Sequence, residues 1–268
     1  MKKICFLSLL ICAFCSLHAA VSIEHKQTRK GSREYNSFKI LNASPVKYAI
    51  DYNISERKGK KTVGDSSASS TGIGLNNGWY GSATLRIGVN GKSLTSPAKI
   101  SKNAGTLTFT WDEAVLTMTF PEGSDKIFCH VSAPGAKRLT LGFLGMPGFL
   151  AKRKTEMKSW VSTEKVNHFL NDGKYQTRGE VWYMFYDRES NRRGIPVVLL
   201  DPSEVKSGNV TGGAKRLLIV SSFEMKKSEC RFLLMGIPSG HMDAETLYED
   251  LKANGGKYLE QLKNFQFK

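Results

Sequence analysis

Residues 106–120 read TLTFTWDEAVLTMTF, and this stretch decides the class of fold. Leu107, Phe109 and Trp111 alternate with threonines, and the alternation resumes at Leu116 after an acidic turn. Successive side chains of a β-strand point to opposite faces, so the apolar residues share one face and the threonines share the other. The stretch therefore predicts a β-hairpin with one buried face and one face in water.

Strand patterning continues through most of the chain. Further alternating segments occur at residues 46–54, 85–89 and 139–143. Continuous apolar runs, which are typical of strands covered on both faces, occur at residues 181–186, 195–200, 217–220 and 232–237. Many short strands separated by turn signals predict a mainly β protein.

Helix patterning is confined to the C-terminal end. Asp243 is a suitable N-cap for a helix in which Leu247 and Leu251 lie on one stripe. We expect Gly255-Gly256 to end this helix and a second short helix to follow at residues 258–262. Strands followed by short C-terminal helices predict a large antiparallel β-sandwich. The number of strands suits the supersandwich of galactose-mutarotase-like domains, which is a likeness of architecture only.

The first twenty residues have the pattern of a secretory signal peptide. Lys2 and Lys3 form a basic start, residues 4–17 are almost continuously apolar, and Ala19-Ala20 closes the segment. The apolar run is shorter than the roughly 20 residues that a membrane-spanning helix needs. We therefore expect the protein to be secreted or periplasmic/extracellular.

The predicted domain organisation follows from this leader. Residues 1–20 are the signal peptide, and residues 21–268 form a single β-sandwich domain with a flexible loop at residues 55–81. That loop combines a basic run, a serine-rich middle and a Gly-Trp-Tyr-Gly end. Loops of this length in compact domains are usually functional or disordered.

The charge of the chain indicates anionic partners. The formal net charge of +15 becomes +13 when Lys2 and Lys3 leave with the leader. Such a charge raises the local concentration of acidic glycans, envelope polymers and nucleic acid. Nucleic acid is the least favoured of these, because the basic residues are spread along the chain and no nucleic-acid-binding module is recognisable. We expect no cofactor.

Two cysteines remain after the leader, Cys129 and Cys230. Both lie in phase with apolar neighbours in strand-like runs, which predicts that both point inward. Export would place them where a disulfide persists, and a bridge would close a loop of about 100 residues. Buried free thiols are equally compatible with the pattern.

Aromatic side chains are the predicted ligand contacts. Flat rings stack against the apolar faces of sugars, and neighbouring basic groups hold carboxylate or sulfate. The competing interpretation is core packing, above all for the ring inside the apolar run 181–186. The candidate ligand-binding residues are Trp79, Tyr80, Trp160, Trp182, Tyr186 and Arg188.

Candidate catalytic residues are Glu180, Asp187 and His241. Glycoside hydrolysis needs two carboxyl groups about 5–10 Å apart, and Glu180 and Asp187 flank the aromatic run. The sequence contains no Gly-x-Ser-x-Gly nucleophile motif and no second pair of ligands to complete a metal site with His241. We therefore expect no metal.

Three hypotheses about function remain open at this point. The first is a non-catalytic exported sandwich that binds a glycan or another anionic surface polymer. The second is a carbohydrate-active enzyme, an epimerase, lyase or hydrolase, on a similar scaffold. The third is a structural or interaction component of the cell envelope.

Overall fold

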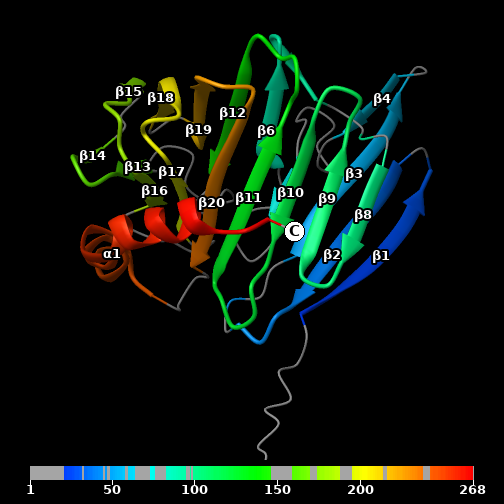
Figure 1. Cartoon of the computed structure of the whole chain (residues 1–268), viewed down its shortest axis with the longest axis horizontal. Helices are drawn as coiled ribbons and strands as arrows, with labels where there is room; N and C mark the ends of the chain where they lie inside the picture. Colours follow the sequence, from blue (N-terminus) through cyan, green and yellow to red (C-terminus); the bar gives the residue numbers. More distant parts are fainter. Residues whose placement is uncertain are drawn as a thin grey trace, which may run out of the picture.

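A computed structural model defines the architecture of the chain. The residues that it describes are 21–31, 33–44, 46, 49–57, 60–63, 73–75, 83–94, 97, 99–145, 159–169, 174–187, 195–213, 216–237 and 242–267. The predicted signal peptide lies outside these residues and stays a prediction. The predicted class is confirmed, because the protein is mainly β, with two antiparallel sheets that face each other (Figure 1).

The larger sheet, called sheet A, contains 11 strands, all paired in antiparallel fashion. β4 (Lys60–Val63) pairs with β3, and β7 (Lys92–Ser93) pairs with β6, at the side of the main strand path. Along that path the order is β1 (Ser22–Lys30), β2 (Arg33–Leu41), β3 (Ala49–Arg57), β5 (Ile73–Leu75), β6 (Ala83–Val89), β12 (Leu139–Gly145), β19 (Arg216–Met225), β18 (Val205–Gly213) and β15 (Lys174–Gln176).

The second sheet, sheet B, contains nine strands. Their order is β14 (Asn167–Phe169), β13 (Ser159–Ser162), β16 (Trp182–Asp187), β17 (Ile195–Leu200), β20 (Glu229–Ile237), β11 (Lys126–Ser132), β10 (Val115–Thr119), β9 (Thr106–Thr110) and β8 (Lys99–Asn103). The stretch that decides the fold forms β9 and β10. Its alternating residues Leu107, Phe109, Leu116 and Met118 are buried, while Val115 and the threonines of both strands are half-buried.

The main core lies between the two sheets. Sheet A contributes Leu85 and Leu141, and sheet B contributes Phe109 and Leu116, each at most 1% exposed. The alternating strands put these apolar side chains on the inner faces, which is the arrangement that the period-two pattern predicts. The hydrophobic effect on these faces stabilises the sandwich, since apolar burial contributes about 25 cal/mol per Å².

The prediction of a loop throughout residues 55–81 is wrong in part. Residues 60–63 form β4, which makes a hairpin with β3, and residues 73–75 form β5, which lies between β3 and β6. These strands are short and surrounded by polar residues, so neither has enough periodicity to be recognised in the sequence. Backbone pairing with β3 holds both segments as strands, which their own sequence does not indicate.

One helix, α1 (Ala244–Asn264), covers part of the outer face of sheet B. Leu247, Leu251 and Leu262 pack against apolar side chains of β16, β17 and β20. Figure 1 shows the helix in front of this end of sheet B. Asp243 is confirmed as the N-cap, since its carboxylate accepts a hydrogen bond of 2.8 Å from the Thr246 backbone N–H.

The predicted break at Gly255-Gly256 is wrong, because α1 runs through both glycines. A Cβ on Gly255 would lie 2.6 Å from Cδ1 of Trp182, so the glycine lets the helix approach the indole ring. This buried contact offsets the cost of about 1 kcal/mol that a glycine imposes inside a helix. The two short helices of the prediction are therefore one continuous helix.

The chain end after α1 continues along sheet B. The Phe265 ring stacks on Phe128 with ring centroids 4.1 Å apart, and Arg231 donates a hydrogen bond of 2.9 Å to the Lys263 carbonyl. The Arg231 guanidinium also lies 5.6 Å from the centre of the Phe267 ring. The arginine thus satisfies a carbonyl of the last helical turn and attaches the C-terminal residues to the sheet.

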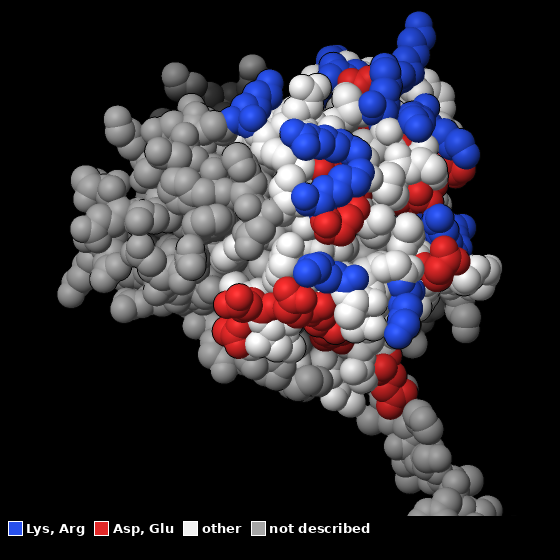
Figure 2. Space-filling model, turned by 90° about the vertical axis from the view of Figure 1, so that its left-hand side faces the viewer, with Lys and Arg blue, Asp and Glu red and all other residues white. Residues whose placement is uncertain are grey.

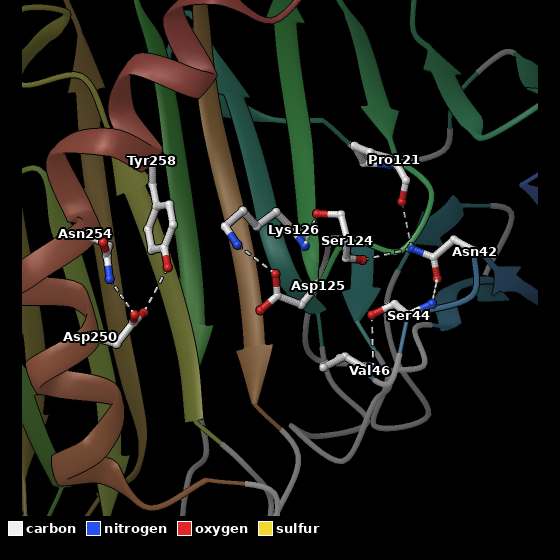
Figure 3. Close-up of polar contacts among 10 residues, drawn as sticks. All are labelled: Asn42, Ser44, Val46, Pro121, Ser124, Asp125, Lys126, Asp250, Asn254 and Tyr258. Carbon is white, nitrogen blue, oxygen red and sulfur yellow. Dashed lines mark hydrogen bonds and ion pairs between the residues drawn. The ribbon is translucent and has the colours of Figure 1, made fainter.

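A polar cluster fixes the side of α1 that faces β11 (Figure 3). Tyr258 donates a hydrogen bond of 3.0 Å to Asp250, and Asn254 donates one of 2.8 Å to the same carboxylate. The ammonium group of Lys126 lies 4.4 Å from the centre of the Tyr258 ring and 2.8 Å from Asp125. Burial and the hydrogen bond to Asp250 raise the pKa of Tyr258 to about 12.

Asn42 joins the two sheets at the end where β2 finishes (Figure 3). Its side chain is 1% exposed, and its amide nitrogen donates to the carbonyl oxygens of Pro121 at 3.1 Å and Ser124 at 2.9 Å. Its side-chain oxygen accepts from the Ser44 backbone N–H. A buried asparagine with these partners holds the β2–β3 connection against the β10–β11 connection.

The two cysteines are buried free thiols. Cys129 pairs across β11 and β20 with Phe232, whereas Cys230 pairs with Val131, so the two cysteines are diagonal neighbours on one face. Diagonal Cβ atoms in an antiparallel pair are about 7 Å apart, and a disulfide needs about 4 Å. Burial raises the pKa of both thiols. Of the two alternatives for these residues, the structure therefore has the free thiols.

Candidate anion-binding surface

Two of the predicted ligand-binding aromatics lie in the core. Trp182 is 1% exposed and Tyr186 is 6% exposed, and both pack with α1 against the outer face of sheet B. Ser162 donates a hydrogen bond of 3.1 Å to the Tyr186 hydroxyl. The prediction that these rings stack on a ligand does not fit these positions, because both side chains are buried.

The other predicted ligand contacts are not placed by the structure. Trp79, Tyr80 and Arg188 lie outside the described residues. Trp160 belongs to β13, where its backbone pairs with Tyr186, and its side chain is not described.

The candidate catalytic Glu180 is a buried structural group. It is 0% exposed, and its carboxylate accepts hydrogen bonds from the Tyr183 hydroxyl at 3.0 Å and the Arg178 backbone N–H at 2.6 Å. The Tyr175 hydroxyl is a third donor. Burial raises the pKa of both tyrosines above the usual value, and the Glu180 carboxylate raises it further. Three donors occupy a carboxylate that water does not reach.

The predicted carboxylate pair does not form. Glu180 precedes β16 and Asp187 ends it, so the whole of that strand lies between them. A strand rises about 3.3 Å per residue, which separates Trp182 and Asp187 alone by roughly 17 Å. This exceeds the 5–10 Å that glycoside hydrolysis requires.

The third candidate catalytic residue is not placed either. His241 lies outside the described residues. Among the side chains that the structure describes, no three His, Cys, Asp or Glu residues gather as a metal site would require. No helix of the described segments is long and apolar enough to cross a bilayer.

The topology of sheet A collects basic residues at one end. In an antiparallel sheet the turns that follow alternate strands lie at the same end. The end of β1, the start of β2, the end of β3 and the end of β6 meet there, together with the start of β12 and the end of β19. This end is at the top of Figure 1.

We call this set of positions the basic rim. The rim follows the main strand path of sheet A from β1 to β18, which contains eight strands. Neighbouring strands lie about 4.8 Å apart, so the rim extends over roughly 34 Å. Arg33, Arg57, Lys60 and Lys61 belong to it by backbone position. Its described and exposed side chains are Lys30, Lys92, Lys137, Arg138, Lys206, Lys226 and Lys227.

The carboxylate of Glu224 orients two basic side chains in the middle of the basic rim. Glu224 lies 2.9 Å from Nε of Arg138 and 2.7 Å from Nζ of Lys206. The glutamate side chain is 19% exposed, whereas the arginine and lysine side chains are 54% and 64% exposed. The hydrogen bond from Lys206 and the charge of Arg138 lower the pKa of Glu224. The two cations are thus oriented by Glu224 while more than half of each side chain stays exposed.

Backbone contacts brace the neighbouring turns. The side-chain oxygen of Asn90 accepts hydrogen bonds from the backbone N–H groups of Lys137 and Arg138, at 2.9 and 3.2 Å. The Asn90 N–H donates to the Arg138 carbonyl at 2.9 Å. The β6–β7 turn and the β11–β12 connection are therefore held side by side, which fixes the spacing of their basic side chains.

Charge is unevenly distributed over one described face of the molecule. On the face drawn in Figure 2, Lys and Arg side chains gather toward the top, and the largest group of Asp and Glu lies below them. A surface with one sign of charge at one end attracts anions and orients them during approach. This arrangement can hold carboxylate, sulfate or phosphate groups without any reaction taking place.

Sequence reasoning missed the basic rim, because the basic residues are spread along the chain. A usable signal was present: Lys30 and Arg57 lie at the turns that follow β1 and β3, the two strands that flank β2. Once the strands are known to pair consecutively, turns two strands apart must meet at one end. The strand order brings basic residues from distant segments together on one surface.

Comparisons with known proteins identify no family. No family model matches the chain. No curated protein matches it either. Among solved structures, the glucosidase II alpha subunit in a Tris-bound crystal structure is similar over 84% of this chain and 33% of that chain, with 9% sequence identity and a TM-score of 0.23. The chain thus spans about a third of that protein, and a likeness at this TM-score carries no argument about function.

Proposed function

We propose that the protein is exported and binds an anionic surface polymer through the basic rim, without catalysing a reaction. The observation that carries this proposal is the collection of basic turns at one end of sheet A. The Glu224 contacts to Arg138 and Lys206 support it, because they hold two cations in place before a ligand arrives. Glu180 supports the non-catalytic part, because its carboxylate is buried and occupied by three donors.

Export is the part of the proposal that rests on the leader. We expect the protein recovered from its native compartment to begin at Ala20 or Val21, since small residues close the apolar segment. N-terminal sequencing or mass spectrometry of the native protein measures this directly. Recovery of the chain with Met1 and the leader intact in the cytosol contradicts export.

Neutralising the basic rim is expected to weaken binding to an acidic polysaccharide by about tenfold at low salt, which corresponds to about 1.4 kcal/mol. The variant carries Lys137→Gln, Lys226→Gln and Lys227→Gln, three exposed side chains. The expected loss shrinks as salt is added, because exposed charges are screened within about 10 Å at 0.1 M. Isothermal titration with polygalacturonate measures the change.

A matched control removes the same charge elsewhere. Lys39→Gln, Lys252→Gln and Lys257→Gln change three exposed lysines, one on β2 away from the rim and two on α1. We expect less than a threefold loss for this control. Equal losses for the two variants would show that net charge alone attracts the polymer, and a wild-type protein that binds no polyanion at low salt would remove the proposal.

A further inference from the structure

The outer face of sheet A carries uncharged polar side chains next to the basic rim. Tyr175, Val210 and Phe223 point into the core, so their neighbours in the strands point outward. Among these outward residues, hydroxyl and amide groups occupy adjacent positions on β15, β18 and β19. We call the set the polar patch, and it consists of Gln176, Ser207, Asn209 and Ser222.

The strand register makes the polar patch continuous. Gln176 pairs with Asn209, and Asn209 pairs with Ser222. Ser207 pairs with Glu224, the carboxylate that orients Arg138 and Lys206. Directly paired side chains lie about 5 Å apart, so the patch begins where the basic rim ends. Gln176, Ser207 and Ser222 are exposed, and Asn209 is half-buried.

We infer that the polymer is an acidic polysaccharide that lies on the outer face of sheet A, with its anionic groups on the basic rim and its hydroxyl groups on the polar patch. This inference rests on the proposed function and names its ligand class. Hydroxyl and amide side chains both donate and accept hydrogen bonds, which is what sugar hydroxyls require. Lysine and arginine hold the carboxylate or sulfate groups.

The described side chains favour a polysaccharide over a nucleic acid. Proteins that bind single-stranded nucleic acid without sequence preference stack bases on exposed aromatic rings. Every Trp, Tyr and Phe ring whose side chain the structure describes is buried or half-buried. The basic rim would attract a nucleic acid, but these rings do not offer it a stacking platform.

The test compares two polymers that have one carboxylate per repeating unit. Polygalacturonate has sugar hydroxyls, and poly-L-glutamate of matched length has none. A patch variant carries Gln176→Ala, Asn209→Ala and Ser222→Ala and keeps every charge. A control variant carries Gln261→Ala, Asn264→Ala and Gln266→Ala, three exposed neutral residues on or after α1. Binding of each full chain is measured by titration at low salt, and circular dichroism checks that it folds.

We expect the patch variant to bind polygalacturonate about tenfold less tightly than the wild type, with poly-L-glutamate and the control variant unaffected. If the wild type binds both polymers and the patch variant changes neither affinity, the inference is overturned while the proposed function stands. If the wild type binds neither polymer, the proposed function itself fails. Tighter binding to a single-stranded nucleic acid than to polygalacturonate would also overturn the inference.

Discussion

Replacing Glu180 by alanine is expected to destabilise the protein by about 3–5 kcal/mol. The substitution leaves donors without the hydrogen-bond acceptor that the carboxylate provides. The Tyr175 and Tyr183 hydroxyls and the Arg178 backbone N–H all donate to Glu180. Each unsatisfied buried polar group costs about 1–3 kcal/mol, and the truncation also leaves a cavity. Denaturant unfolding of the purified protein measures the loss.

Two further variants separate the role of the carboxylate from general sensitivity of this region. Glu180→Gln keeps one acceptor oxygen, so we expect a loss roughly half as large. Glu164→Ala removes a half-buried carboxylate that accepts from the Val181 and Trp182 backbone N–H groups, and we expect a loss of about 1 kcal/mol. A loss below about 1 kcal/mol for Glu180→Ala would show that the tyrosines find other partners.

Two adjacent glycines of α1 are expected to respond to alanine with opposite signs. Gly255→Ala should destabilise the protein by about 2 kcal/mol, because the new Cβ would lie 2.6 Å from Cδ1 and 2.9 Å from Nε1 of Trp182. The indole is 1% exposed and enclosed by other buried side chains, so a shift of the ring would disturb their packing. Gly256→Ala should stabilise the protein by about 0.5–1 kcal/mol, since nothing lies within 4 Å of its added Cβ and alanine favours helix.

The mechanism behind this contrast is testable with a smaller ring. In a Trp182→Phe background, we expect Gly255→Ala to cost measurably less than in the wild type, because the clash partner is reduced. Thermal and denaturant unfolding of the four members of this cycle give the coupling free energy. A stabilising Gly255→Ala, or an unchanged cost in the phenylalanine background, would show that the helix does not rest on the indole.

The basic rim and the polar patch illustrate how an antiparallel sheet builds a surface. Lys30, Lys92 and Lys227 are far apart in the sequence and are brought to one end by strand pairing. Gln176 and Ser222 lie on either side of Asn209, because β18 lies between their strands. A chain that lies across strand ends would therefore contact residues from many segments, and each contact would contribute little by itself.

The period-two pattern determined by itself that the chain forms strands with one buried face. Leu107, Phe109 and Leu116 are buried as their spacing requires, and Asp243 caps the helix as its side chain allows. These features depend on neighbours within a few residues, so the local sequence contains the information for them. The sequence predicted the free thiols only as one of two alternatives. It did not predict the single helix.

The tertiary structure alone decided the rest. Gly255 lies inside a helix, where its buried contact with Trp182, 73 positions earlier in the chain, leaves room for a hydrogen atom and not for a methyl group. Trp182 and Glu180 are core residues because α1 and the two tyrosines enclose them. The basic rim exists because β12 pairs with both β6 and β19, which brings segments far apart in the sequence to one end of sheet A. Contacts between distant segments select among structures that the local pattern permits equally.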